Sequence, residues 1–447
     1  MARIIVVGSG VAGLAAAARL ASGANDVTVV ERNSGPGGSL MWATPDTITL
    51  PAVLRDLFVK TGGRKASAGG KLEEVVDLRP IDPVRTYRFA DGSRLDLPNA
   101  ARGASKEAFD AAFGSGAGDA WLGLVDHGNR AWSAIRPTLV EVPDAGRADL
   151  WRLLRNTAAR RALAPRRTLR LVAEAAGVRD PRMMQVVDEF ARAAGAAPEK
   201  APSVLAIRPY IEQTFGAWRI VGGLSELAAA LYERCGKRGV GFRFDAEVTA
   251  IAEGSVTLAG GERLTADVVV AAVDAHVLAR LTGGKANSTA DYSPSILSVR
   301  MESRDTADRA YETVLFGQGG EPTIRVRVAP ERPNEWIAAT DVTRDETSLD
   351  TEGVRVAVAR RMGIAADLLR VRDAFTPTDR EALTGTPGGS LNGPAINSLS
   401  SAILRSPTVQ PIKGLLHIGP SARPGPGIAF AALSSWNAAE VLKPTRL

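Results

Sequence analysis

The first forty residues constrain the fold more than any other stretch of the chain. Residues 4–7 form a β-branched run without alternation, which is typical of a parallel strand buried on both faces. Three glycines follow, and residues 14–20 then favour a helix. At this spacing Gly8 allows a tight turn, Gly10 leaves room for a pyrophosphate, and Gly13 lets the helix pack close to the sheet. The pattern predicts a dinucleotide-binding unit with phosphates at the helix N-terminus.

A second strand is predicted at residues 27–30, and Glu31 ends it. A carboxylate at this place can accept hydrogen bonds from ribose hydroxyls, and it repels the 2′-phosphate of an NADP-type ligand. The pair Gly37-Gly38 follows soon after. NAD enzymes do not need this pair, whereas flavoproteins of the glutathione-reductase type carry it, so the predicted ligand shifts from NAD to FAD.

Length and composition narrow the class of protein. A chain of 447 residues is long enough for two or three domains. The first strand starts at residue 3, which leaves no room for a signal peptide, and no apolar run is long enough to span a bilayer. The lone Cys235 and three scattered histidines predict neither disulfides nor a metal site, and a net charge of +6 is mild. We therefore expect a cytoplasmic protein that does not bind nucleic acid.

The chain changes character along its length. Strand patterns vanish between about 100 and 200, where alanine, arginine and leucine recur at helical spacing. The predicted fold is α/β, with a Rossmann-type (glutathione-reductase-like) FAD-binding domain and a discontinuous substrate domain made of an antiparallel sheet and a helical insertion. The predicted FAD-binding domain comprises residues 1–86, 214–285 and 385–447. Residues 87–213 form the helical insertion, and residues 286–384 form the substrate-domain sheet.

Individual elements follow from the same patterns. Helices are predicted at residues 52–58, 224–236, 352–362 and 430–442. Strands are predicted at residues 85–89, 93–97, 207–213, 240–244, 247–251, 255–258, 266–272, 295–302, 323–328 and 336–343. A strand, a glycine-proline elbow and a helix close the chain after residue 414, so we expect the cofactor to be held by both ends of the sequence.

Residues 150–172 are strongly basic. One interpretation is a helix on a membrane surface that carries Trp151, Leu153 and Leu154. The other is the solvated face of an ordinary helix, which we favour because Pro165 interrupts the pattern.

These segments together resemble the carotenoid-desaturase-type (phytoene dehydrogenase-like) flavoproteins, within the wider group of amine oxidases and protoporphyrinogen oxidase. The resemblance runs nearly end to end. It is carried by residues 4–38, 44–58, 78–93, 209–224, 385–393 and 421–428. The loop before Pro45 is shorter than usual, and four residues depart from the family pattern near the flavin and the substrate: Ser39, Thr44, Asn392 and Arg423. We therefore expect a substrate other than a long C40 carotene.

The resemblance implies non-covalently bound FAD and hydride removal from an activated C–H to flavin N5, with reoxidation by oxygen or a quinone. It implies these cofactor-binding residues: Gly8, Ser9, Gly10, Val11, Ala12, Gly13, Glu31, Arg32, Gly37, Gly38, Ser39, Pro45, Val248, Gly419, Gly425, Gly427, Ile428 and Ala429. The substrate is expected to be a hydrophobic small molecule. A weak peripheral membrane contact and the oligomeric state stay open.

Four residues are candidates for the chemistry or the substrate cavity. Glu212 is a candidate base, although a strand carboxylate in a salt bridge is the stronger interpretation. Arg423 could hold an anionic substrate or the negative charge of the flavin, or it could cap loop carbonyls. Trp218 could wall the cavity, although a core tryptophan is commoner. Asn392 stands where the family usually has tyrosine.

The sequence thus predicts an FAD-dependent desaturase that forms a new C=C bond. A flavin amine oxidase acting on a C–N bond, a redox-neutral double-bond isomerase and a non-catalytic FAD-binding partner protein are the alternatives. The mild basic excess also suits an acidic or acyl-carrier-bound substrate.

Overall fold

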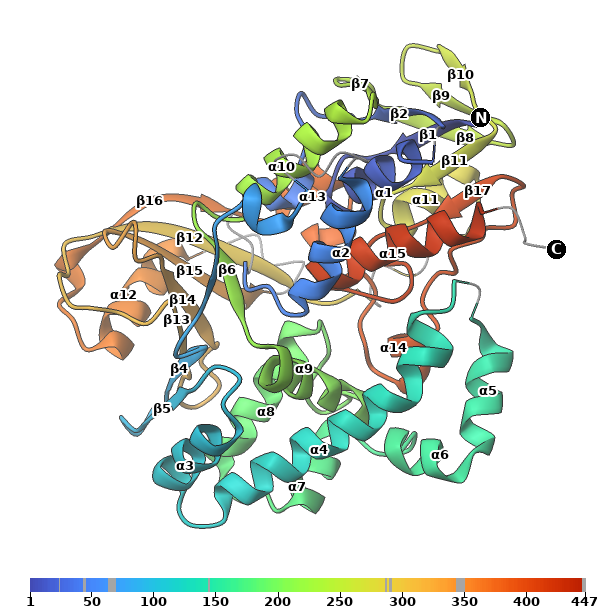
Figure 1. Ribbon diagram of the computed structural model, residues 1–447. Helices are drawn as coiled ribbons and strands as arrows, with labels where there is room; N and C mark the ends of the chain where they lie inside the picture. The colour runs from blue at the N-terminus through green and yellow to red at the C-terminus, as the bar shows by residue number, and fades with distance from the viewer. Residues whose placement is uncertain are drawn as a thin grey trace.

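The computed structural model describes residues 1–23, 25–42, 46–62, 70–143, 145–285, 288, 292–342 and 350–443. Figure 1 shows three parts packed side by side: a parallel sheet with its helices, a second and larger sheet, and a layer of helices below them. The α/β fold with a Rossmann-type unit is confirmed.

The parallel sheet is assembled from both ends and the middle of the chain. Its strand order is β17-β11-β1-β2-β7, and every neighbouring pair is parallel. The strands are β1 (Arg3–Val7), β2 (Asp26–Val30), β7 (Gly241–Arg243), β11 (Val268–Ala271) and β17 (Leu415–His417). Strand β1 lies in the centre, so it pairs on one side with the nearby β2 and on the other with β11, which lies more than 260 residues later in the sequence.

Both faces of β1 are buried, as its unbroken apolar run predicts. Ile4 and Val6 pack toward helices, whereas Ile5 and Val7 pack toward a small antiparallel sheet and a helix on the opposite face. The helices on the first face are α1 (Val11–Ala21), α2 (Pro51–Thr61), α10 (Leu224–Lys237) and α15 (Ile428–Val441). The other face carries β8 (Val248–Ala252), β9 (Ser255–Leu258), β10 (Arg263–Thr265) and α11 (Ala275–Thr282).

The second sheet has seven strands in the order β16-β12-β15-β14-β13-β4-β5. All its pairs are antiparallel except β13 with β4. Helix α12 (Thr351–Met362) packs on it. The strands are β4 (Arg85–Arg88), β5 (Arg94–Leu97), β12 (Ser295–Ser303), β13 (Glu312–Leu315), β14 (Ile324–Val328), β15 (Glu335–Val342) and β16 (Leu369–Phe375). The sequence patterns missed β13 and β16.

The helical layer confirms the predicted change of character after residue 100. Its helices are α3 (Arg102–Phe113), α4 (Ala117–Ile135), α5 (Arg147–Arg155), α6 (Thr157–Leu163), α7 (Leu169–Ala176), α8 (Pro181–Ala193) and α9 (Ile207–Phe215). The remaining elements are β3 (Leu78–Pro80) paired with β6 (Trp218–Ile220), α13 (Pro377–Thr384) and α14 (Leu399–Ile403).

One prediction in this layer is wrong. Residues 207–213 form the helix α9 rather than a strand. Apolar residues at alternate positions suggested a strand, but the short segment fits a helical face equally well. Pro209 lies in the first turn of α9, where its missing N–H costs no hydrogen bond. Gly128 of α4 allows this segment to pack close, because a Cβ there would lie 2.0 Å from the carbonyl oxygen of Ala206.

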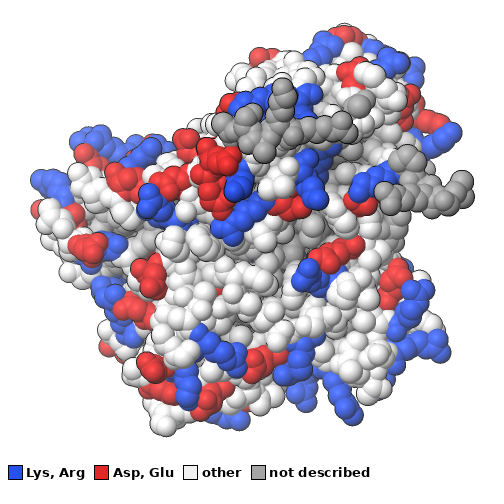
Figure 2. Space-filling view, viewed as in Figure 1, with Lys and Arg blue, Asp and Glu red and all other residues white. Residues whose placement is uncertain are grey.

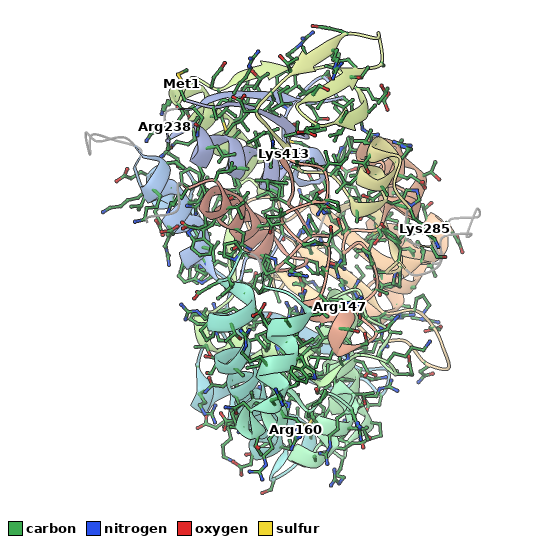
Figure 3. The ribbon with its side chains drawn as sticks, turned by 90° about the vertical axis from the view of Figure 1, so that its right-hand side faces the viewer. Met1, Arg147, Arg160, Arg238, Lys285 and Lys413 are labelled. Carbon is green, nitrogen blue, oxygen red and sulfur yellow. The ribbon has the colours of Figure 1, made fainter. Side chains whose placement is uncertain are left out.

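The basic segment falls on α5, α6 and the start of α7. Leu153 and Leu154 pack against a buried cluster, whereas Trp151 is 61% exposed and stacks with Arg155. Figure 3 shows Arg160 near the outer end of the helical layer and Arg147 closer to the rest of the molecule. On the face drawn in Figure 2, acidic and basic side chains are interspersed around an uncharged central area. None of the helices within the described residues combines the length and apolar character needed to cross a bilayer.

Candidate active site

The first of two adjoining cavities lies at the carboxyl ends of the parallel strands, where ligands bind in sheets of this kind. Its volume is about 180 Å³. Its walls come from the turn after β1, the end of β2, the residues after β11, and loops near both ends of the chain. The lining residues include 7–12, 30–33, 38–39, 246–248, 272–274, 383–393 in part, and 420–421.

The three glycines of the first turn have different surroundings. A Cβ on Gly13 would lie 2.0 Å from the carbonyl oxygen of Gly8, and one on Gly8 would lie 2.8 Å from that of Ala272. Gly8 also has a φ of +97°. By contrast, a Cβ on Gly10 would meet no atom within 4 Å, and Gly10 lines the cavity. Gly8 and Gly13 are therefore required by packing, whereas the space at Gly10 is available to a ligand.

Glu31 is one of three acidic residues that line this cavity, together with Glu247 and Asp274. Its side chain is buried, and one oxygen, Oε2, accepts hydrogen bonds from the backbone N–H and the hydroxyl of Ser9 at 2.8 and 2.7 Å. The other, Oε1, accepts from the backbone and side-chain amides of Asn33 at 2.9 and 2.8 Å. These bonds fix the carboxylate at the cavity wall, where its remaining lone pairs can accept from a ligand hydroxyl.

The end of the chain completes the walls. The backbone N–H of Gly419 donates to Ser434 Oγ on α15 at 3.1 Å, and the next two residues, Pro420 and Ser421, line the first cavity. Gly427, Ile428 and Ala429 start α15 and line the second cavity. Residues from both ends of the sequence therefore meet around the same space.

Most of the predicted cofactor residues are brought together. Those that line the first cavity are Gly8, Ser9, Gly10, Val11, Ala12, Glu31, Arg32, Gly38, Ser39 and Val248, and those that line only the second are Gly427, Ile428 and Ala429. Gly13, Gly37, Gly419 and Gly425 support these loops without lining either cavity. Pro45 and Thr44 lie outside the described residues. An open backbone cradle beside a helix N-terminus, with a fixed carboxylate, fits the phosphates and the ribose of FAD.

The second cavity adjoins the first. Val11, Ser39, Leu391 and Pro420 belong to the walls of both. Its volume is about 270 Å³, and more than half of its lining residues are apolar. It lies between the parallel-sheet unit, the helices α8 and α9, and the second sheet.

One wall of the second cavity consists of paired charges. Arg85 on β4 donates to both oxygens of Glu212 on α9, at 2.9 and 2.8 Å, and also pairs with Glu312 on β13. Burial alone would lower the pKa of Arg85, but the two carboxylates outweigh it and hold that pKa well above its usual range. The arginine therefore stays charged.

A second arginine repeats this arrangement. Arg325 on β14 pairs with Glu189 on α8, and with Asp341 on β15 at 3.0 Å. Its pKa is raised in the same way, because the two carboxylates outweigh the effect of burial. Each of the two arginines thus joins a helix to the second sheet across the cavity wall.

The four predicted catalytic residues have different positions. Glu212 and Asn392 line the second cavity, but Glu212 lies on a helix and is engaged by Arg85. Trp218 and Arg423 line neither cavity. The indole N–H of Trp218 donates to the carbonyl of Phe215, and Nε of Arg423 donates to the carbonyl of Arg405 at 3.2 Å.

Sequence reasoning missed the cavity arginines Arg85, Arg192, Arg208 and Arg325. Arg325 offered a signal, because it alternates with buried apolar residues in β14 and an arginine on a half-buried strand needs a partner. Within the described part of the chain, no cluster of His, Cys, Asp and Glu side chains has the makings of a metal site.

Comparisons with known proteins agree with this geometry. Residues 6–51 match the NAD(P)-binding Rossmann-like domain, and residues 91–307 match the flavin containing amine oxidoreductase family. The chain is 28% identical to a hydroxyneurosporene desaturase from Rubrivivax gelatinosus, over 98% of this chain and 93% of the relative. It is 27% identical to the zeta-carotene-forming phytoene desaturase of Myxococcus xanthus, over 97% and 92%.

Solved structures share the fold at low identity. An oxidoreductase from Methanosarcina mazei aligns with a TM-score of 0.64 and 14% identity, over 98% of this chain and 99% of that one. The cyclohexylamine oxidase of Brevibacterium oxydans aligns with a TM-score of 0.63 and 14% identity, over 99% and 100%.

Fold, cavity and matches together define the class: the chain is an FAD-dependent oxidoreductase. Within that class it is similar to the phytoene desaturase-like flavoproteins of the flavin amine oxidoreductase superfamily.

Proposed function

We propose that this enzyme removes hydride from a C–H bond of a hydrophobic small molecule and leaves a new C=C bond. The observation that carries the proposal is that the two cavities adjoin, because shared wall residues place a dinucleotide cradle next to a largely apolar chamber. Bound FAD supplies the hydride acceptor, and the chain supplies position and a site shielded from bulk water.

The roles of the cofactor residues are part of this proposal. The backbone from Gly8 to Gly10 would hold the phosphates, and Glu31 would accept from the ribose hydroxyls. Gly427 to Ala429, at the start of α15, would face the ring system, where the helix N-terminus favours negative charge.

Arg85 supports a structural role for Glu212. Both oxygens of the Glu212 carboxylate accept hydrogen bonds from the buried guanidinium, so the side chain is held in a fixed position at the cavity wall. We therefore propose that the Arg85–Glu212–Glu312 group shapes the chamber, and that Asn392 contacts the substrate there. Trp218 and Arg423 are not assigned to the chemistry.

The substrate class follows from the chamber. Eight of its lining residues are charged, and covering them with a pure hydrocarbon would remove them from water without offering any polar contact. This supports a hydrophobic substrate with polar groups rather than a long C40 carotene. C–H oxidation ranks above C–N oxidation because the full-length relatives carry the names of desaturases.

The test begins with the absorption spectrum of the purified protein, followed by anaerobic photoreduction. Flavin bands that bleach and return on adding air identify oxygen as the acceptor, and bands that return only with a quinone identify a quinone. Product analysis with candidate substrates then distinguishes the reactions: a C=C bond supports the proposal, whereas an imine or aldehyde, an isomer without net oxidation, or a protein that never takes up FAD contradicts it.

A weak peripheral membrane contact through α5 is a second proposal. It is supported by the exposed Trp151 and by neighbouring arginines such as Arg152 and Arg155, which suit an interface with anionic lipid. Sedimentation with vesicles containing anionic lipid, compared between the native protein and Trp151→Ser, tests it. Equal sedimentation of both would contradict it.

A further inference from the structure

Arg208 differs from the other charged residues of the second cavity. It projects from α9 and lines the cavity beside the elbow that precedes α15. One terminal nitrogen, Nη2, donates to the carbonyl of Pro426 at a long 3.4 Å. Arg208 is partly exposed and forms no ion pair with any residue in the described ranges. Burial lowers its pKa to about 10, although the charge of Glu212, one turn further along α9, acts in the opposite direction.

The carboxylates of the cavity are all engaged elsewhere. Glu212 and Glu312 pair with Arg85, and Asp341 pairs with Arg325. Glu189 pairs with Arg325, and its Oε2 lies 3.8 Å from Nη1 of Arg192. Among the four cavity arginines, Arg208 alone therefore forms no ion pair within the described residues, although the charge of Glu212 acts on it from the same helix.

A second cation lies near Arg208. Arg405 is buried close enough to Arg208 for their charges to repel, and its guanidinium donates to the carbonyls of Asn392 and Pro394 at 2.5 and 3.1 Å. Asp274 offsets part of the charge of Arg405, but the guanidinium of Arg208 faces the second cavity without an ion pair of its own, and an anion there would relieve the repulsion between the two arginines. A buried charge without a partner is costly, so its retention calls for a ligand that supplies the missing charge.

The geometry points to a carboxylate. A guanidinium fork matches the two oxygens of a carboxylate, and the rest of the chamber wall is largely apolar. We propose that Arg208 binds the carboxylate of an amphiphilic acid whose apolar part fills the second cavity, and so determines which end of the substrate lies beside the elbow at Pro426. This inference rests on the proposed function, because it takes the second cavity as the substrate chamber.

The test measures binding without turnover. The FAD-loaded enzyme is titrated with decanoate, decanol and decyl phosphate below their micellar concentrations, with calorimetry and the change in flavin absorbance as readouts. We expect decanoate to bind about 10- to 100-fold more tightly than decanol, as a charged hydrogen-bonded pair in an enclosed site allows. In Arg208→Gln this preference should vanish, while decanol binding changes less than about twofold. Arg208→Lys should keep part of the preference.

Arg192→Gln is the matched control, because Arg192 lines the same cavity but lies near Glu189. It should keep the preference for decanoate. The proposal fails if the native enzyme binds decanoate and decanol equally, if Arg208→Gln keeps the preference, or if Arg192→Gln loses it as well. Tighter binding of decyl phosphate than of decanoate would overturn the choice of a carboxylate.

The flavin itself is the other group that Arg208 could serve. The flavin midpoint potential of Arg208→Gln, measured without any acid present, separates the two roles. An unchanged potential with a lost preference for decanoate supports the substrate role, and a lowered potential with the preference intact overturns it. Because FAD content is read in the same titration, failure of this inference is distinguishable from failure of the enzyme to bind flavin or to oxidise a substrate.

Discussion

Arg85 holds Glu212 by two parallel hydrogen bonds of 2.9 and 2.8 Å, and so connects the second sheet to helix α9. The two residues are 127 positions apart in sequence. Because α9 also supplies Arg208 and Ile211 to the substrate chamber, this contact sets the position of one chamber wall.

Arg85→Met should be strongly destabilising. The substitution leaves the carboxylates of Glu212 and Glu312 buried without their partner, and breaking a buried pair in this way costs about 3–5 kcal/mol. Thermal unfolding should show a lower Tm for the variant. Glu212→Gln should lower the free energy of unfolding by less, since Arg85 still forms its ion pair with Glu312. An unchanged Tm in Arg85→Met would contradict this account.

Gly10→Ala and Gly13→Ala should fail in different ways. A methyl group on Gly10 meets no protein atom, and its φ of −67° suits alanine, so the protein should fold but bind FAD weakly. A methyl group on Gly13 would lie 2.0 Å from the Gly8 carbonyl oxygen and should disrupt packing of α1 on the sheet. Circular dichroism and Tm of the FAD-free proteins, followed by FAD titration, separate the two effects. Equal Tm losses in both variants would refute the distinction.

Glu31→Gln should lower the affinity for FAD. The amide nitrogen of glutamine cannot accept the hydrogen bonds that Ser9 and Asn33 donate, and the charge that favours ribose hydroxyls is lost. We expect an increase in Kd of about tenfold or more, as for loss of charged hydrogen bonds. The ratio of flavin absorbance to protein after dialysis measures it. Glu262→Gln, at an exposed hairpin, is the control and should retain FAD.

The stability of the protein should fall as the pH drops below about 6.5, the usual pKa of an unfolded histidine. Burial lowers the pKa of His417, which contacts Ser406 Oγ and the carbonyl of Val273 at 2.7 and 2.9 Å. Since the folded pKa lies below the unfolded one, the unfolded chain takes up the proton first. The stabilisation is complete above about pH 6.5 and is lost as the pH falls toward the folded pKa.

Tm measured from about pH 7.5 to 5.5 checks this expectation. His417→Gln should have a smaller slope of Tm against pH than the native protein. Burial lowers the pKa of His127 too, so protonation of His127 also destabilises the folded protein as the pH falls. His127→Gln should therefore reduce the slope of Tm against pH by a separate amount. A slope unaffected by either substitution would show that other groups control the pH dependence.

The parallel-sheet unit could be predicted because local sequence and global fold agree there. The apolar run of β1, the three glycines and Glu31 each require the same turn, and the structure has them within one short segment. The segment that became α9 carries no such agreement. The spacing of its apolar residues is compatible both with a strand and with one face of a helix, and only packing against α4 selects the helix.

The charged chamber wall could not be predicted for a different reason. Arg85, Glu212 and Glu312 come from three distant segments, and nothing in the local pattern of any one of them specifies the other two. Arg208 is harder still, because its significance lies in the lack of an ion pair within the described structure: Glu212, four residues along the same helix, pairs with Arg85 instead, which only the three-dimensional arrangement reveals.

The order of the parallel sheet has a consequence for synthesis of the protein. Strand β1 leaves the ribosome first, yet its neighbour β11 starts at Val268 and the edge strand β17 starts at Leu415. The nascent turn from Gly8 to Gly13 must therefore wait for nearly the whole chain before its surroundings exist. We therefore expect flavin capture to come late, after synthesis of β17, so that the flavin colour of a preparation should report the fraction of chains whose parallel sheet is complete.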